Sequence, residues 1–183
     1  MRVIAGSAKG VRLAAVPRGV RPMSDVAREG LFSSLGSAVV GARVLDLFAG
    51  TGALGIEALS RGAAEAVFVE RSPAALRAIR TNLQRTGLAD RAVVVGLDVR
   101  AFLTRRERNG APFDLALADP PYDLPASELG GVLEELARGW LAPGWTVALT
   151  RRKGSSTPVV PLHWAPARSL EYGDTLVVLL REA

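Results

Sequence analysis

The chain has 183 residues, of which 49% are hydrophobic and 22% charged, a composition typical of one globular domain with a sizeable core. It contains no cysteine and a single histidine, which excludes disulfides and thiolate metal sites and argues against any metal centre. No apolar run approaches the roughly 20 residues of a membrane span, and the start lacks the apolar core of a signal peptide. We therefore expect a cytoplasmic protein.

The net charge is +5, and residues 1–42 carry +4 of it, with six basic against two acidic groups. A basic segment at one end of a chain predicts an anionic macromolecular partner, most simply nucleic acid. A solvated, arginine-rich surface is the alternative. The basic residues of this segment are Arg2, Lys9, Arg12, Arg18, Arg21 and Arg28.

Residues 2–16 predict a β-hairpin, because two short apolar and basic runs flank a turn with glycines at both ends. A two-stranded hairpin is marginal alone and must dock elsewhere. A loop over 17–22 follows, and then a helix through Leu35 that Ser24 or Asp25 can N-cap. Its apolar stripe is predicted to be Val26, Ala27, Gly30, Leu31 and Leu35.

From residue 43 onward the hydrophobic pattern alternates between strand and helix, which predicts a mostly parallel sheet with helices on both faces. Two further strands, joined by Gly173-Asp174, predict an antiparallel pair that closes the sheet. We thus expect an α/β fold, Rossmann-like, with a hairpin extension at 1–22 and the main domain at 23–183. The expected strands are 43–48, 66–70, 92–97, 113–118, 145–150, 168–172 and 175–180, and the expected helices are 54–61, 73–86, 99–108 and 126–139.

The first strand of this series ends in a glycine-rich turn. Glycines at 50, 52 and 55 satisfy G-x-G-x-x-G, and Glu70 lies twenty residues after Gly50 at the end of the next strand. Glycines let bare backbone N–H groups approach a ligand at a helix N-terminus, and a carboxylate at position 70 can accept both hydroxyls of a ribose.

Asp46 distinguishes two ligand classes for this turn. A dinucleotide places its pyrophosphate at the helix N-terminus, where a carboxylate four residues before Gly50 would repel it. The same carboxylate suits a cofactor with cationic groups, such as the ammonium and sulfonium of S-adenosylmethionine. A purely structural turn, with Asp46 accepting from backbone N–H groups, is the remaining alternative.

Carboxylates recur at the ends of successive strands. Asp46, Glu70, Asp98 and Asp119 each follow or end a predicted strand, and in an open α/β sheet these ends form the ligand-binding edge. Asp98 can accept from an adenine amino group while the Val99 N–H donates to a ring nitrogen. The sequence therefore predicts an adenosyl site along this edge.

Asp119-Pro120-Pro121-Tyr122 is the most specific motif of the chain. Consecutive prolines hold the strand end rigid, so the Asp119 carboxylate and the Pro120 carbonyl can both accept from one exocyclic amine. Two acceptors on its N–H groups favour a pyramidal nitrogen whose lone pair attacks a methyl group. Tyr122 supplies a face on which a flipped base stacks. A strand-to-loop stop with a surface tyrosine is the alternative.

Asp46-Leu47-Phe48-Ala49-Gly50-Thr51-Gly52 together with Asp119-Pro120-Pro121-Tyr122 resembles the class I S-adenosylmethionine-dependent methyltransferases that act on exocyclic amines. Three N-terminal segments narrow the resemblance to one family of these enzymes. They are Arg2-Val3-Ile4-Ala5-Gly6, Gly10-Val11-Arg12-Leu13 and the run from Arg21 to Phe32. These are similar to the bacterial 16S rRNA guanine-N2 methyltransferases of the small-subunit "D" type, nearly end to end. Met23 departs from the threonine that this family often carries.

The resemblance implies methylation of one guanine N2 in 16S rRNA, within an assembled or assembling 30S subunit, by a monomer that needs S-adenosylmethionine and no metal. The catalytic residues implied are Asp119, Pro120, Pro121 and Tyr122. The cofactor-binding residues implied are Asp46, Ala49, Gly50, Gly52, Gly55, Glu70, Arg71, Asp98, Val99 and Asp119. RNA contacts are expected from Lys9, Arg12, Arg18, Arg21 and Arg28.

Three other functions compete with this one. A DNA or RNA adenine-N6 methyltransferase uses the same tetrapeptide, although the DNA enzymes usually carry a recognition domain for which this chain has no room. Asp46 and the proline pair argue against an NAD-dependent oxidoreductase. The carboxylates present at every strand end argue against a non-catalytic RNA-binding assembly factor. Of the remaining residues, His163 is expected to have a surface or packing role and the three tryptophans to pack in the core and in loops. The run 151–153 is either a solvated loop or a second RNA contact.

Overall fold

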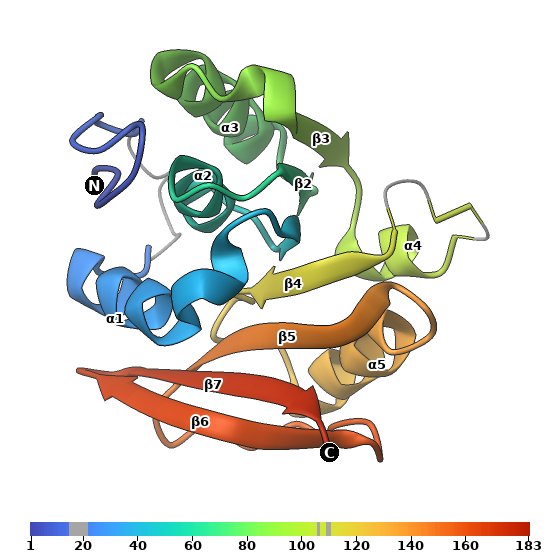
Figure 1. Cartoon of the computed structure of the whole chain (residues 1–183). Helices are drawn as coiled ribbons and strands as arrows, with labels where there is room; N and C mark the ends of the chain where they lie inside the picture. Colours follow the sequence, from blue (N-terminus) through green and yellow to red (C-terminus); the bar gives the residue numbers. More distant parts are fainter. Residues whose placement is uncertain (15–21, 106, 109–110) are drawn as a thin grey trace.

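The computed structural model describes residues 1–14, 22–105, 107–108 and 111–183, so the expected loop over 17–22 lies largely outside the described residues, and Arg18 and Arg21 lie wholly outside them. A seven-stranded sheet runs through the molecule in the order β3-β2-β1-β4-β5-β7-β6 (Figure 1). Strands β1 to β5 pair in parallel, and β7 pairs antiparallel with both β5 and β6. This confirms the predicted sheet and its antiparallel closing pair. The strands are β1 Arg43–Leu47, β2 Glu65–Glu70, β3 Ala92–Gly96, β4 Phe113–Ala118, β5 Leu141–Arg152, β6 Trp164–Tyr172 and β7 Thr175–Glu182.

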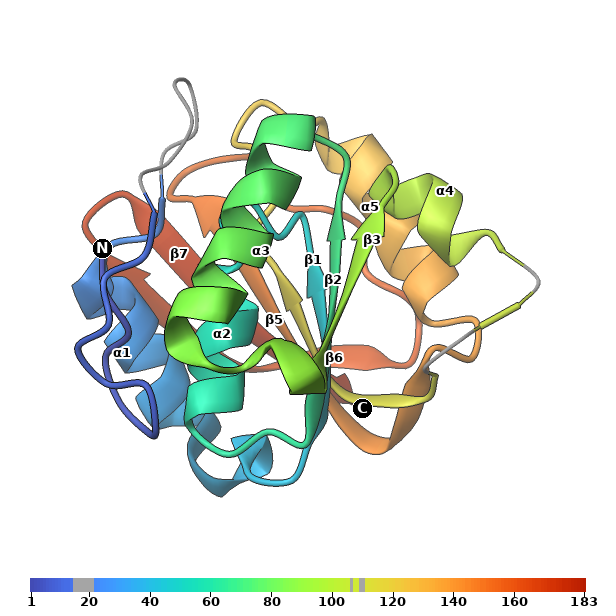
Figure 2. The same cartoon turned by 90° about the horizontal axis from the view of Figure 1, so that it is seen from above.

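Helices cover both faces of the sheet, as Figure 2 shows, with α1, α2 and α3 on one face and α4 and α5 on the other. Each face has its own buried apolar cluster, and the central strands are buried on both sides. The helices are α1 Asp25–Leu35, α2 Ala53–Ser60, α3 Pro73–Thr86, α4 Val99–Leu103 and α5 Ala126–Leu136. Among the described residues, no helix is long and apolar enough to cross a membrane.

Helix α1 begins as predicted, because the Ser24 hydroxyl accepts from the Ala27 N–H at 3.1 Å. Its predicted apolar stripe is wrong at Val26 and leaves out the buried Phe32. Val26 is 66% exposed, whereas Arg28 is fully buried. The stripe that faces the sheet is instead made by Ala27, Leu31, Phe32 and Leu35.

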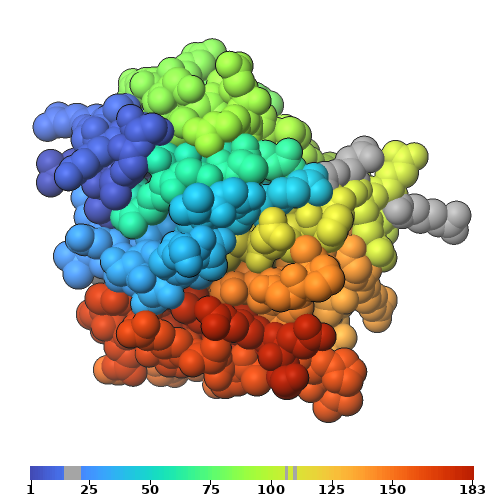
Figure 3. Space-filling model, viewed as in Figure 1, coloured from blue at the N-terminus to red at the C-terminus, as the bar shows by residue number. Residues whose placement is uncertain are grey.

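Residues 1–14 fold back on themselves and lie along α2, on the surface shown in dark blue in Figure 3. The predicted hairpin is reduced to a single antiparallel bridge between Arg2 and Arg12. Beside it, the Val3 N–H donates a hydrogen bond to the carbonyl of Val11 at 3.0 Å. Glu57 of α2 accepts from the N–H groups of Ile4 and Ala5 at 2.9 and 3.0 Å. The segment therefore docks on the main domain through backbone bonds rather than through a sheet.

Several predicted boundaries differ from the structure, including the starts of β5 at Leu141 and of β6 at Trp164, each four residues earlier than predicted. Helix α4 ends at Leu103, where Thr104 forms its C-cap, and α5 ends at Leu136, three residues before the left-handed Gly139. Strand β5 continues through Arg152 because it pairs with β7 up to Thr175. Arg151 is consequently buried in the sheet, so it belongs neither to a solvated loop nor to an exposed RNA contact, the two alternatives expected for the run 151–153.

Candidate active site

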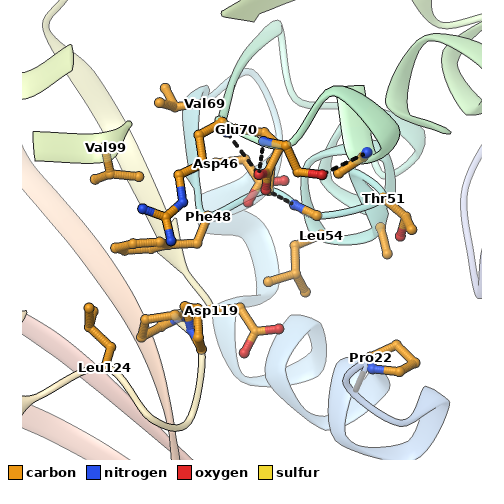
Figure 4. A pocket seen from close by; sticks show the side chains of 18 of the residues that line it. Pro22, Asp46, Phe48, Thr51, Leu54, Val69, Glu70, Val99, Asp119 and Leu124 are labelled. Atoms are coloured by element: carbon orange, nitrogen blue, oxygen red, sulfur yellow. Dashed lines mark hydrogen bonds between the residues drawn. The ribbon is translucent and has the colours of Figure 1, made fainter. Parts of the chain in front are cut away.

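An open pocket of about 590 Å³ lies at the carboxyl ends of the parallel strands, where the sequence places the ligand edge. Figure 4 shows Asp46, Glu70 and Asp119 around it, with Val99 on one side and Pro22 on the other. The structure brings together nearly all of the predicted cofactor-binding and catalytic residues. Those that line the pocket are Asp46, Ala49, Gly50, Glu70, Arg71, Asp98, Val99, Asp119, Pro120, Pro121 and Tyr122.

Gly52 and Gly55 shape the turn without lining the pocket. Gly52 has a φ of +78° and forms the N-cap of α2, a conformation that favours glycine. A Cβ on Gly55 would lie 2.4 Å from the Phe68 ring and 2.9 Å from Asp46 Oδ2. The absence of a side chain at Gly55 therefore allows its N–H to reach the Asp46 carboxylate.

Asp46 is buried at the end of β1, 1% exposed, and its Oδ2 accepts from the Gly55 N–H at 2.9 Å. Burial raises the pKa of Asp46 well above its ordinary value, and the nearby Asp119 and Glu70 raise it further, while the Gly55 bond acts in the opposite direction. A cationic ligand group in the pocket would relieve this accumulation of negative charge. The site is therefore electrostatically suited to a cation and unsuited to a pyrophosphate.

Glu70 is fixed by three backbone donors, a role that the sequence did not predict. Its Oε2 accepts from the Gly50 N–H at 2.8 Å, and its Oε1 accepts from the N–H groups of Arg71 and Ser72 at 2.8 Å (Figure 4). The carboxylate thus joins the glycine turn to the start of α3. Because each oxygen has more than one lone pair, ligand hydroxyls can still donate to it.

Asp98 N-caps α4, with Oδ1 accepting from Arg100 at 2.9 Å and Ala101 at 3.3 Å. Its Oδ2 lies 3.6 Å from Nη1 of the exposed Arg71 and remains open to a ligand donor. Phe48 adds an apolar wall on this side and holds an unusual φ of +58° for a non-glycine residue. This part of the pocket combines polar acceptors with apolar surface, as a purine ring requires.

The Asp119-Pro120-Pro121-Tyr122 segment is held from the neighbouring strands. The Thr150 hydroxyl of β5 donates to Asp119 Oδ1, and the hydroxyl of Tyr122 lies 3.2 Å from Thr175 Oγ1 at the start of β7. Arg151 donates through Nη1 to the carbonyl of Leu124 at 3.2 Å. Burial raises the pKa of Asp119, and the Thr150 bond lowers it.

Sequence reasoning missed Thr150 and Thr175, which lie outside the pocket lining but position the residues that do line it. Nothing in the local sequence marks either threonine, since each acts on a residue more than thirty positions away. Met23, Phe48 and Leu54 also line the pocket and were not predicted as ligand contacts.

The predicted RNA contacts separate into three groups. Lys9 and Arg12 are exposed, and Arg18 and Arg21 lie outside the described residues. Arg28 as an RNA contact is wrong, because its side chain is fully buried against α2. Trp140, Trp145 and Trp164 are buried, which confirms their expected packing role, and His163 is exposed, in agreement with the surface role expected for it.

Comparison with known proteins reveals relatives along the whole chain. A ribosomal RNA small subunit methyltransferase D of Escherichia coli is 36% identical over 95% of this chain and 86% of its own length, and its Haemophilus influenzae counterpart is 31% identical over 90% and 84%. A hypothetical protein of Thermus thermophilus has a solved structure that superposes with a TM-score of 0.81 at 37% identity, covering 98% of both chains.

A family model described as Conserved hypothetical protein 95 matches residues 1–181. This match covers both the basic N-terminal segment and the pocket. The chain belongs to the Conserved hypothetical protein 95 family, the family of the small-subunit ribosomal RNA methyltransferases D.

Proposed function

We propose that this protein transfers a methyl group from S-adenosylmethionine to the exocyclic N2 amine of a guanine in 16S rRNA. The observation that carries the proposal is the convergence of Asp46, Glu70, Asp98 and Asp119 on one pocket, at the rigid Asp119-Pro120-Pro121-Tyr122 strand end. The name of the E. coli relative, a ribosomal RNA small subunit methyltransferase, supports the choice of RNA.

The pocket fits S-adenosylmethionine better than a nicotinamide dinucleotide. Six carboxylates line it, and Asp46 is buried among them, so cationic ammonium and sulfonium groups are favoured there. Glu70 would accept from the ribose hydroxyls, while Asp98 and the Val99 N–H would bind the adenine edge. When bound, S-adenosylmethionine supplies an electrophilic methyl group.

The chain's own contribution to the chemistry lies in orienting the amine. The Asp119 carboxylate and the Pro120 carbonyl accept from the two N–H groups of the target, which directs the nitrogen lone pair towards the cofactor side of the pocket. The Tyr122 ring, held by its hydroxyl at Thr175, offers a stacking face for a base taken out of its helix. Thr150 keeps Asp119 in the required orientation.

The N-terminal segment is the proposed RNA-binding surface. Lys9 and Arg12 are exposed on it, and the segment lies against α2, which starts at the glycine turn of the pocket. A basic surface beside the pocket would bind the phosphates that flank a flipped guanine. The proposed substrate is 16S rRNA in an assembled or assembling 30S subunit, bound by one copy of the chain.

The test is transfer of a radiolabelled methyl group to naked 16S rRNA, 30S particles and DNA in parallel, followed by identification of the product nucleoside. We expect N2-methylguanosine from the ribosomal substrates and no product from DNA. N6-methyladenosine would support the alternative amine specificity. Incorporation at the wild-type rate in Asp119→Asn would show that Asp119 does not orient the target amine.

A further inference from the structure

A buried arginine with unused donors lines the pocket. Arg28 of α1 has no exposed side-chain surface, yet its Nε and Nη1 have no hydrogen-bond partner. Its Nη2 alone is engaged, by the carbonyl of Arg2 and by Asp25 Oδ1, the latter at 2.9 Å. Buried guanidinium donors are normally satisfied, because a buried polar group without a partner loses its hydration and gains no hydrogen bond in exchange.

The charges around Arg28 do not account for Nη1. Glu57 is the other buried ion nearby, with Oε2 at 3.8 Å from Arg28 Nε, but its oxygens already accept from Ile4, Ala5 and Arg61. Burial lowers the pKa of Arg28, while Glu57 and Asp25 partly offset that effect. The Arg28 guanidinium is buried and has an unpaired N–H donor next to the pocket, so it is suited to binding an anionic ligand group.

The rest of the pocket leaves few places for an anion. Six carboxylates line it, and among the described lining residues only Arg28 and Arg71 carry cationic side chains. Arg71 is exposed and its Nη1 already lies 3.6 Å from Asp98 Oδ2. Arg28 is therefore the buried cationic side chain that an anionic group entering this pocket can meet.

The start of α2 adds a second attractive feature. Gly52 forms its N-cap without a capping side chain, and Ala53 and Leu54 of its first turn line the same pocket. A helix N-terminus carries a partial positive charge and backbone donors that favour anions. Glu57, one turn after Leu54, is the residue that approaches Arg28, so the buried guanidinium and the first turns of α2 lie together.

We propose, on the basis of the proposed function, that Arg28 binds the carboxylate of the methionine moiety of S-adenosylmethionine. The zwitterionic end of the cofactor would then meet opposite charges, with its ammonium at the acidic strand ends and its carboxylate at Arg28 and the start of α2. A phosphate of the RNA is not the expected partner, because Arg28 lies beneath the surface. Met1 and Met23 line the same pocket as Arg28, and methionine side chains are flexible enough to move aside for a ligand.

Binding of S-adenosylmethionine and of its decarboxylated analogue, measured by calorimetry without RNA, tests this assignment. Wild-type protein should bind the decarboxylated analogue at least tenfold more weakly. Arg28→Met should lose at least tenfold in affinity for S-adenosylmethionine and hardly any for the analogue, so that its preference disappears. Arg71→Met, the matched control, should retain the wild-type preference. Equal loss for both ligands in Arg28→Met would overturn the proposal.

Arg28→Met leaves Glu57 without a buried cation, so Arg28→Met/Glu57→Gln is a second variant, checked for folding by circular dichroism. A crystal structure of the wild-type protein with S-adenosylhomocysteine is an independent measurement. The ligand carboxylate should lie within hydrogen-bond distance of Arg28 Nη1, and a carboxylate bound elsewhere would refute the assignment. If the wild-type protein binds no S-adenosylmethionine, the proposed function itself fails, whereas binding without the carboxylate preference refutes only this inference.

Discussion

The Thr150 hydroxyl donates a hydrogen bond to the carboxylate of Asp119, although 31 positions separate the two residues. The parallel pairing of β4 with β5, which places Ala118 opposite Leu149, makes the contact possible. Thr150 is itself fully buried, so water cannot replace it as the donor. The orientation and the pKa of Asp119 thus depend on a strand that contributes no lining residue to the pocket.

Thr150→Val should lower kcat by about tenfold or more, the effect of losing a hydrogen bond to a charged group. Because the Thr150 bond lowers the pKa of Asp119, its loss raises that pKa. The acidic limb of the pH profile of kcat should therefore move to higher pH. Thr150→Ser keeps the donor and should restore the wild-type profile. An unchanged limb in Thr150→Val would show that Asp119 does not titrate in the reaction.

Asp119→Asn should reduce kcat by on the order of 10²–10³-fold, the range seen when one preorganised electrostatic group is removed from an active site. Affinity for S-adenosylmethionine should stay within about threefold, because the role of Asp119 is directed at the target amine. Single-turnover methyl transfer and calorimetry measure the two quantities separately. A large loss of cofactor affinity would instead assign Asp119 to cofactor binding.

Tyr122→Ala should weaken use of the RNA substrate by about 1–3 kcal/mol, the contribution of stacking one base on an aromatic ring. Tyr122→Phe keeps the ring and loses only the contact with Thr175, so we expect a smaller effect of about 1 kcal/mol. Thr175→Val should match Tyr122→Phe, and the double variant should be no worse than either. Equally severe effects of Phe and Ala at this position would favour a direct role for the hydroxyl.

Asp46→Asn should stabilise the unliganded protein at neutral pH and weaken S-adenosylmethionine binding. The pKa of Asp46 is raised on folding, so the folded state binds the proton more tightly and stability falls as pH rises from about 4 through the raised pKa. The neutral amide removes this fall, and its oxygen can still accept from Gly55. Urea unfolding across pH measures the effect, with exposed Asp123→Asn as the control. A variant less stable than wild type at pH 7 would contradict the expectation.

Neutralising Lys9 and Arg12 by Lys9→Gln and Arg12→Gln should lower the salt dependence of RNA binding. Two lost phosphate contacts reduce the slope of log K against log salt by roughly 1.4–1.8. The control is Arg168→Gln with Arg181→Gln, which removes the same charge from exposed positions on the last two strands. Identical slopes for both double variants would place RNA binding elsewhere.

The sequence alone was sufficient to predict the sheet, the glycine turn and the carboxylates at the strand ends. These features are local, because a buried strand, a G-x-G-x-x-G turn and an Asp-Pro-Pro-Tyr stop each need only neighbouring residues to be recognised. Parallel strands then bring their carboxyl ends to one edge by a general rule of α/β folds. The sequence by itself therefore assigns Asp46, Glu70, Asp98 and Asp119 to one site.

The tertiary structure decided how those residues are held, and it reversed the role of Arg28. In the sequence, Arg28 is one of several basic residues in the N-terminal segment. In the structure, the packing of α1 against α2 and residues 1–14 buries its side chain beside Glu57. In the same way, Arg151 became a sheet residue because β5 pairs with β7 to its end. Burial and hydrogen bonding between residues distant in the chain depend on how elements pack, and no local pattern of residues encodes that packing.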